Sequence, residues 1–133
     1  RKKAEAQGCA NVTFEARAAE EPGGGPAGLH DAVLAFNVLH LVANRAAVLA
    51  DAHRLLKPGG LFISKTPCLK EMNPLIRLAI PVMQLIGKAP PVDVFGAAEL
   101  EAGVAAAGFT IIERDRHGSG RTAPRIFLVA RRD

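Results

Sequence analysis

The stretch from residue 31 to residue 60 constrains the fold more than any other part of the 133-residue chain. Residues 32–36 are continuously apolar, as expected for a strand of a parallel sheet that is covered on both faces. Asn44 belongs to the residue types that cap the amino end of a helix. Apolar residues then recur at helical spacing as far as Leu55, which predicts an amphipathic helix packed against the sheet.

A proline and two glycines end that helix and lead into a second strand. Pro58 disfavours helical backbone at Lys57, and Gly59 and Gly60 permit a tight reversal. Residues 61–66 are apolar enough to form another strand. Strand, helix and strand together predict a β-α-β unit with a right-handed crossover, and most of the functional inference depends on this unit.

The flanking segments extend the alternation of strands and helices. Residues 1–7 are predicted to be the end of a helix, and residues 11–16 alternate in polarity, which predicts a half-buried strand. Residues 17–30 form a loop rich in glycine and proline. Three later elements are a helix at 96–107 and strands at 109–115 and 125–131 joined as a hairpin. This order predicts a mostly parallel α/β sheet that ends in an antiparallel strand pair.

Residues 67–96 differ from the rest because they contain five of the nine prolines. An apolar, helical stretch follows Asn73 and Pro74, and Pro81 is expected to kink it. We interpret the segment as an insertion that lies over the sheet edge. The sequence leaves three roles open for this segment: a lid over an apolar acceptor, a part of the core, or a dimer contact.

Composition argues against several classes of partner. Trp and Tyr are absent, which removes the usual aromatic platforms for single-stranded nucleic acid, although six Phe remain. The formal net charge is +4, and its basic residues gather near the two ends, as in an ordinary solvated surface. The most apolar run, residues 75–87, is too short to span a bilayer. We therefore expect neither a nucleic acid nor a membrane as partner.

The two cysteines, Cys9 and Cys68, lie far apart and outside any metal-ligand spacing. We expect two free thiols in a reducing compartment, which predicts a cytoplasmic protein without a metal site.

The central unit resembles class I S-adenosylmethionine-dependent methyltransferases, most closely the small bacterial methyltransferase-domain proteins called type 11. The likeness is carried by LLKPGG at residues 55–60 and by the strand end at residues 37–40. The helix that contains residues 98–100 and the two strands after it also match the family. The resemblance implies a three-layer Rossmann-like sheet, S-adenosylmethionine as cofactor, and methyl transfer to a small-molecule acceptor.

Two features of that family are not found in this sequence. It has no GxGxG turn after a first strand and no acidic residue after a second one. By the family pattern the 133 residues are the carboxyl-terminal part of one domain and begin in the helix after the second strand. The strands at 11–16 and 32–36 then lack their shared neighbours, so we expect an upstream segment or a second copy to complete the sheet. This part alone is expected to be inactive.

The resemblance assigns adenine contacts to the loop after the strand at 11–16. Ala18, Ala19 and Glu20 occupy the positions of a small-acidic-Ala motif that touches the adenine in the family. Ala18 stands where the family often has Asp, so the contact would come from the backbone amides of Ala18 and Ala19. A plain loop is the alternative interpretation.

The resemblance also assigns cofactor contacts to the end of the central strand. Ala35, Phe36 and Asn37 lie at the carboxyl end of that strand, where open α/β sheets bind their ligands. In the family these positions line the cofactor near its sulfonium. Asn37 either forms a hydrogen bond with the cofactor or caps the loop.

His40 is the candidate catalytic residue, because a neutral imidazole can take a proton from a hydroxyl or amine nucleophile. A structural role for this histidine at the strand end is the alternative.

Three functions are compared. The first is methyl transfer by the parent protein. The second is a non-catalytic α/β module that offers an interface or regulates a partner, which the missing glycine-rich motif favours for this part. A nicotinamide-dependent enzyme is disfavoured, because the KPGG turn and the terminal strand pair are not expected there.

Overall fold

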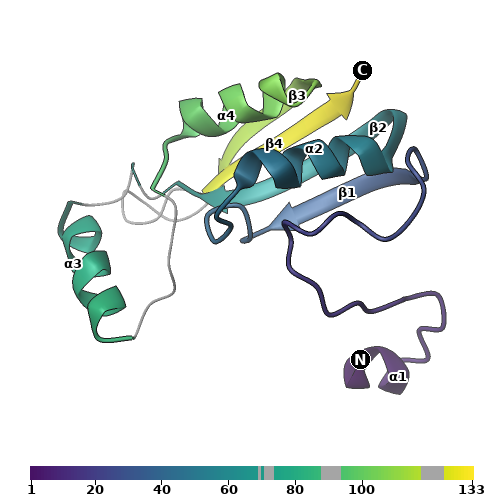
Figure 1. The fold of residues 1–133 in the computed structure, drawn as a ribbon, viewed down its shortest axis with the longest axis horizontal. Helices are drawn as coiled ribbons and strands as arrows, with labels where there is room; N and C mark the ends of the chain where they lie inside the picture. Colours follow the sequence, from purple (N-terminus) through teal and green to yellow (C-terminus); the bar gives the residue numbers. More distant parts are fainter. Residues whose placement is uncertain (69, 71–73, 88–93, 118–124) are drawn as a thin grey trace.

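A four-stranded open sheet forms the centre of the computed structural model, which describes residues 1–68, 70, 74–87, 94–117 and 125–133 (Figure 1). The strands are β1 (His30–Phe36), β2 (Leu56–Pro67), β3 (Phe109–His117) and β4 (Arg125–Arg132). The helices are α1 (Lys2–Ala6), α2 (Arg45–Leu55), α3 (Pro74–Leu85) and α4 (Ala97–Ala106). The sheet order is β1-β2-β4-β3.

The sheet confirms the predicted α/β class and the antiparallel pair at its end. β1 and β2 are parallel, whereas β4 is antiparallel to both β2 and β3. Among the described strands, the β1–β2 pair is therefore the one parallel pairing. The predicted hairpin loop between β3 and β4 falls mainly on residues 118–124, outside the described residues.

The central β-α-β unit forms as predicted, with one difference at its turn. The Asn44 side chain caps α2 by accepting a hydrogen bond from the Ala47 N–H at 3.0 Å. Residues 57–60 do not make a separate reversal, because they form a bulge within β2 opposite one residue of β1. A Cβ atom at Gly60 would lie 2.9 Å from the Lys57 carbonyl oxygen, so this position requires glycine.

The core lies between the sheet and the two helices α2 and α4, which cover the same face. Phe62 is fully buried, and its ring centroid lies 5.3 Å from that of Phe109. Leu49 of α2 and Leu100 of α4 belong to the same buried cluster. Sheet and helices thus make two layers, and α1 and α3 stand away from the sheet, so the described residues do not form the expected third layer (Figure 1).

The opposite face of the sheet carries a row of apolar residues with no described helix over it. Leu34 pairs with Ile63, and Ile63 pairs with Val129, so the row crosses three strands. Leu34 is 59% exposed and Phe36, on the same side of β1, is 51% exposed. β1 is also one of the two edge strands of the described sheet, since no other described residue pairs with its outer edge.

The prediction of a strand at residues 11–16 is wrong, because this segment is irregular and exposed. The Arg1 guanidinium donates a hydrogen bond to the Phe14 carbonyl at 3.1 Å, which joins the segment to the short helix α1. An alternating sequence becomes a strand only when another strand completes its hydrogen-bond ladder. Within the described sheet, residues 11–16 have no such neighbour.

The insertion forms one helix, α3, that runs through Pro81. Figure 1 places α3 beyond the carboxyl ends of β1 and β2, and the prediction that the insertion lies over the sheet edge stays a prediction. Residues 69, 71–73 and 88–93 of this segment are outside the described residues. Among the described helices, none combines the length and the apolar character needed to cross a membrane.

The two faces of the sheet predict unequal losses of stability for two similar truncations. Phe62→Ala should lower the free energy of unfolding by about 3–5 kcal/mol, because it leaves a cavity under α2 and α4. Leu34→Ala, on the uncovered face, should cost less than about 1 kcal/mol. Urea unfolding measures both. A Leu34→Ala cost equal to that of Phe62→Ala would show that the second face is buried in solution.

Candidate functional site

The loop that leaves β1 turns sharply at Asn37. Its φ angle is +54°, and among the described residues no other non-glycine has a positive φ. Asn tolerates this left-handed backbone better than most residues do. The Asn37 N–H donates a 2.8 Å hydrogen bond to the Lys65 carbonyl of β2, so the loop starts from a fixed point at the carboxyl end of the parallel pair.

The predicted cofactor residues of β1 point to opposite faces of the sheet. Ala35 is buried within the core under the helices, whereas Phe36 projects from the uncovered face. Phe36 can therefore offer its ring to a ligand, whereas Ala35 cannot offer its side chain. Leu39 is fully buried and anchors the loop, and the Leu41 N–H closes a turn by donating to the Val38 carbonyl at 2.9 Å.

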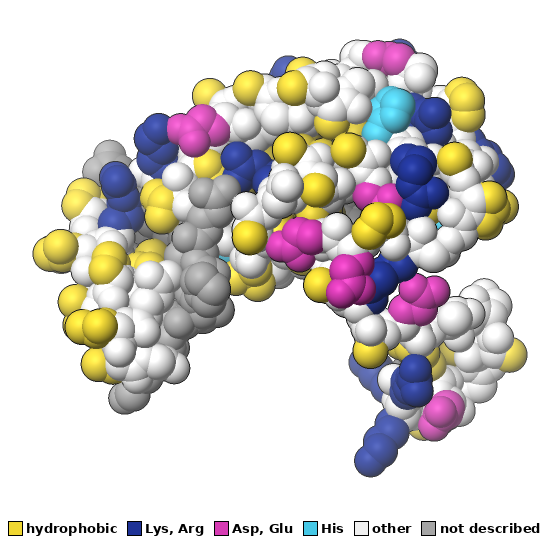
Figure 2. All heavy atoms as spheres, viewed as in Figure 1, with side chains coloured by type: hydrophobic (Ala, Val, Ile, Leu, Met, Phe, Trp, Pro, Cys, Tyr) yellow, Lys and Arg dark blue, Asp and Glu magenta, His cyan; other side chains and the backbone are white. Residues whose placement is uncertain are grey.

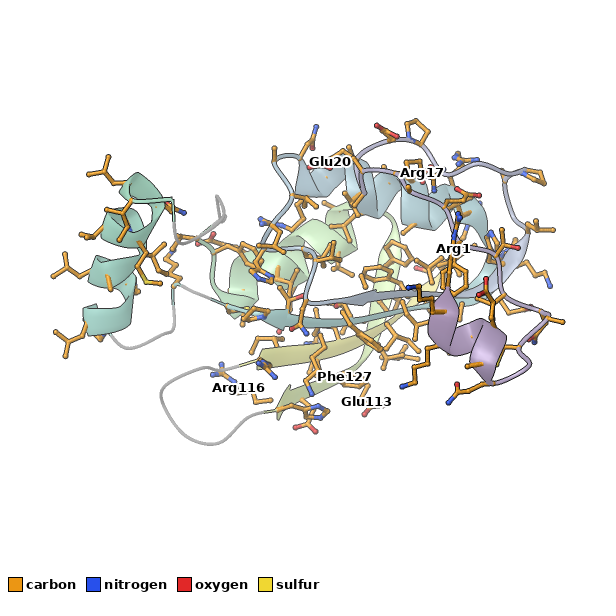
Figure 3. The ribbon with its side chains drawn as sticks, turned by 90° about the horizontal axis from the view of Figure 1, so that it is seen from below. Arg1, Arg17, Glu20, Glu113, Arg116 and Phe127 are labelled. Carbon is orange, nitrogen blue, oxygen red and sulfur yellow. The ribbon has the colours of Figure 1, made fainter. Side chains whose placement is uncertain are left out.

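The structure brings Glu20 to the same loop. Its Oε1 accepts a 2.8 Å hydrogen bond from the Ala43 N–H, one residue before the Asn44 cap. Figure 3 shows Glu20 beside α2. Ala18 and Ala19 are exposed next to it, and the Glu21 N–H donates to the Ala18 carbonyl at 3.2 Å. The two predicted cofactor loops are therefore tied together, and Glu20 is the residue that joins them.

The glycine loop at residues 23–25 packs against α2. The Gly23 N–H donates to Asp51 Oδ2 at 2.7 Å, and Arg54 donates to the Gly23 and Gly25 carbonyls at 2.9 and 3.1 Å. Arg54 also forms an ion pair with Asp51 at 2.8 Å. A Cβ at Gly23 would lie 2.7 Å from Leu55 Cδ1. Gly23 thus allows the loop to pack closely against α2.

His40 lies half-buried in the loop after β1. Its Nδ1 atom is buried and has no hydrogen-bond partner among the described residues. Burial lowers the pKa of His40 below the ordinary value of 6.5, because desolvation disfavours the charged imidazolium. His40 is therefore neutral near pH 7, and a neutral ring can accept a proton.

A cation–π contact that the sequence does not reveal connects α2 to the segment before α4. The guanidinium carbon of Arg45 lies 3.9 Å from the centroid of the buried Phe95 ring. The Lys70 N–H donates to the Phe95 carbonyl at 3.2 Å, and the Lys70 ammonium pairs with Glu99. The hydrogen bond from Lys70 lowers the pKa of Glu99. No local spacing could have predicted contacts between residues so far apart in sequence.

Metal chemistry has no candidate site among the described residues, since no group of three or more His, Cys, Asp or Glu side chains converges there. Cys9 is exposed, Cys68 is buried, and both are free thiols.

Residues 1–62 match a family profile described as methyltransferase domain, of type 12. The likeness to type 11 proteins stays a prediction. No curated protein sequence is significantly similar to the chain.

Many solved structures share the fold. An S-adenosylmethionine-dependent methyltransferase from Mesorhizobium loti has a TM-score of 0.79 at 17% identity, and the match covers 98% of this chain and 74% of that one. The 1,6-didemethyltoxoflavin-N1-methyltransferase of Burkholderia thailandensis, solved with 1,6-didemethyltoxoflavin and S-adenosylhomocysteine, has a TM-score of 0.72 at 22% identity over 98% and 56%. The cyclase SpnF has a TM-score of 0.76 at 16% identity over 98% and 61%.

These identities show a common fold, and a cyclase among the neighbours shows that the fold does not fix the reaction. The chain spans 61% of the cyclase and 56% of the toxoflavin enzyme. The methyltransferase-domain profile covers residues 1–62, and nearly the whole chain shares the fold of S-adenosylmethionine-dependent methyltransferase structures.

Proposed function

We propose that the protein containing this chain transfers a methyl group from S-adenosylmethionine to a small-molecule acceptor. The observation that carries the proposal is the hydrogen bond from the Ala43 N–H to Glu20. It holds two loops together at the carboxyl end of a parallel strand, where open α/β sheets bind their ligands. The profile match to a methyltransferase domain indicates which reaction this geometry would serve.

The residues present fit one part of the cofactor. Exposed backbone at Ala18 and Ala19 is available to the adenine, and the half-exposed Phe36 ring and the Asn37 amide are available to the rest of the ligand. The glycine-rich turn that holds the methionine portion in the family is absent from this sequence. The chain alone therefore supplies only part of the cofactor-binding site, and the proposed activity belongs to the parent protein.

The bound cofactor would supply an electrophilic methyl group on a sulfonium. His40 would accept the proton that a hydroxyl or amine acceptor releases as its lone pair bonds to the methyl carbon and the carbon–sulfur bond breaks. The neutral state of the His40 ring supports this role. The loop, fixed at Asn37 and Leu39, would contribute mainly by positioning.

The proposal includes the setting and the partners of the protein. The two free thiols fit the reducing cytoplasm. The outer edge of β1, unpaired within the described sheet, would be completed by further chain or by a second copy.

A non-catalytic module is the second candidate. It is favoured by the absence of a GxGxG turn from the sequence and by the uncovered apolar face of the sheet. Such a protein would use the β1 edge and this face as an interface and would bind no cofactor.

Calorimetric titration of the full-length protein with S-adenosylmethionine and S-adenosylhomocysteine separates the two candidates. Methyl transfer requires that both ligands bind. Glu20→Ala should weaken both by roughly three- to tenfold, because it removes the hydrogen bond that joins the two loops. Glu21→Ala is the matched control, since the Glu21 side chain forms no hydrogen bond or ion pair among the described residues, and it should leave both affinities unchanged. Absence of heat with either ligand would defeat the proposed function.

A second prediction concerns how the free energy of unfolding depends on acidic pH. Because His40 has a lowered pKa in the folded state, its protonation favours the unfolded chain. Unfolding free energy should therefore fall as the pH drops through 6.5 toward the folded pKa, and His40→Gln should reduce that slope. Asp31, Glu99 and Asp115 also have lowered pKa values, but as carboxylates they cost stability only at more acidic pH. Urea unfolding at several pH values between 7.5 and 5.5 measures the slope, and equal slopes for both proteins would contradict the burial argument.

A further inference from the structure

The helix α3 and Val94 line an open cavity of about 390 Å³. Its walls are mostly apolar and include Leu78, Ile80, Pro81 and Val94. Figure 2 shows hydrophobic side chains gathered over this helix. A volume of this size is within the range of small-molecule sites, which are typically apolar with a few polar groups that orient the ligand.

Arg77 is the charged side chain of the cavity wall. Its guanidinium donates one long hydrogen bond, 3.4 Å, to the Lys70 carbonyl. No carboxylate of the described residues forms an ion pair with it, and the sequence has no acidic residue from position 74 to position 92. A guanidinium has five N–H donors in a planar fork, so most of its donors remain available.

The cavity lies on the side of the molecule where the proposed cofactor loops are. Figure 1 shows α3 beyond the carboxyl ends of β1 and β2. Arg77 bonds to the Lys70 carbonyl, and the Lys70 N–H bonds to the carbonyl of Phe95, the residue after Val94. Phe95 in turn lies under Arg45, at the start of α2. A continuous set of contacts therefore joins the cavity wall to the helix that follows the His40 loop.

We propose that this cavity binds an apolar molecule that carries a carboxylate, with the carboxylate paired to Arg77 and the apolar body against Leu78 and Val94. This rests on the proposed function, in which that molecule is the methyl acceptor. A planar fork matches a carboxylate in two parallel hydrogen bonds. One guanidinium balances the single charge of a carboxylate, whereas a phosphate dianion would call for a second cation, and the described wall offers none.

The outward side of α3 offers a competing surface. Met83 is 42% exposed and does not line the cavity, whereas Leu78 lines it, and the five-residue spacing between them places the two side chains on different sides of the helix. Binding of an apolar molecule to the outward side, as at a lipid surface or a second copy, would not depend on Arg77. The two surfaces are therefore separable by mutation.

The test uses octanoate and octanol, which share an apolar chain and differ in charge, titrated into the full-length protein by calorimetry. Octanoate should bind about tenfold more tightly than octanol, because a charge-assisted pair with Arg77 is available only to the carboxylate. Arg77→Met should abolish the preference. Arg131→Met, a change to an exposed arginine of β4, is the matched control and should retain it. Equal affinities for the two molecules in the unaltered protein would overturn the proposal without any variant.

A second pair of variants locates the apolar part of the site. Leu78→Ser should weaken both ligands roughly fivefold through lost apolar contact, and Met83→Ser should weaken neither. An equal loss in Met83→Ser would place the ligand on the outward side and refute the cavity. Titration of the same samples with S-adenosylmethionine keeps the two proposals apart. Cofactor heat without a preference for octanoate defeats only the acceptor class, and a preference for octanoate without cofactor heat defeats only the methyl transfer.

Discussion

The parallel pairing of β1 with β2 is the constraint on which the rest of the structure depends. Two parallel strands cannot be joined by a tight turn, so the chain must cross over, and α2 makes that crossover. The pairing fixes where β1 ends, and the Asn37 N–H to the Lys65 carbonyl is the hydrogen bond at that end. The loop from Asn37 to Asn44 therefore leaves the sheet from a fixed point. The candidate site is built on this loop.

The central unit was predictable because its signals are local. Asn44 caps α2 as its residue type suggests, and the apolar run of residues 32–36 becomes β1. Residues 11–16 carry an equally clear alternation, yet they form no strand, because a strand depends on a neighbour that a local pattern cannot supply. Long-range contacts such as Arg45 on Phe95 leave no signal in the spacing of residues.

The structure places the predicted site residues in different environments. Glu20 reaches the loop after β1, but its carboxylate holds the Ala43 N–H instead of remaining free for a ligand. Ala35 turns into the core, and Phe36 faces outward. The resemblance could assign these positions to a cofactor, but only the fold shows which of them position a loop and which present a surface. The site roles predicted from the sequence remain proposals for all seven residues: Ala18, Ala19, Glu20, Ala35, Phe36, Asn37 and His40.

The central claim is that two loops, residues 18–20 and residues 36–40, form one cofactor site. Amide chemical shifts of the isotopically labelled full-length protein, recorded as S-adenosylhomocysteine is added, test it most directly. The account predicts that shifts concentrate in both loops, while the amide of Gly23, whose N–H donates to Asp51 on α2, changes little. Saturable binding that leaves both loops unshifted would contradict the account.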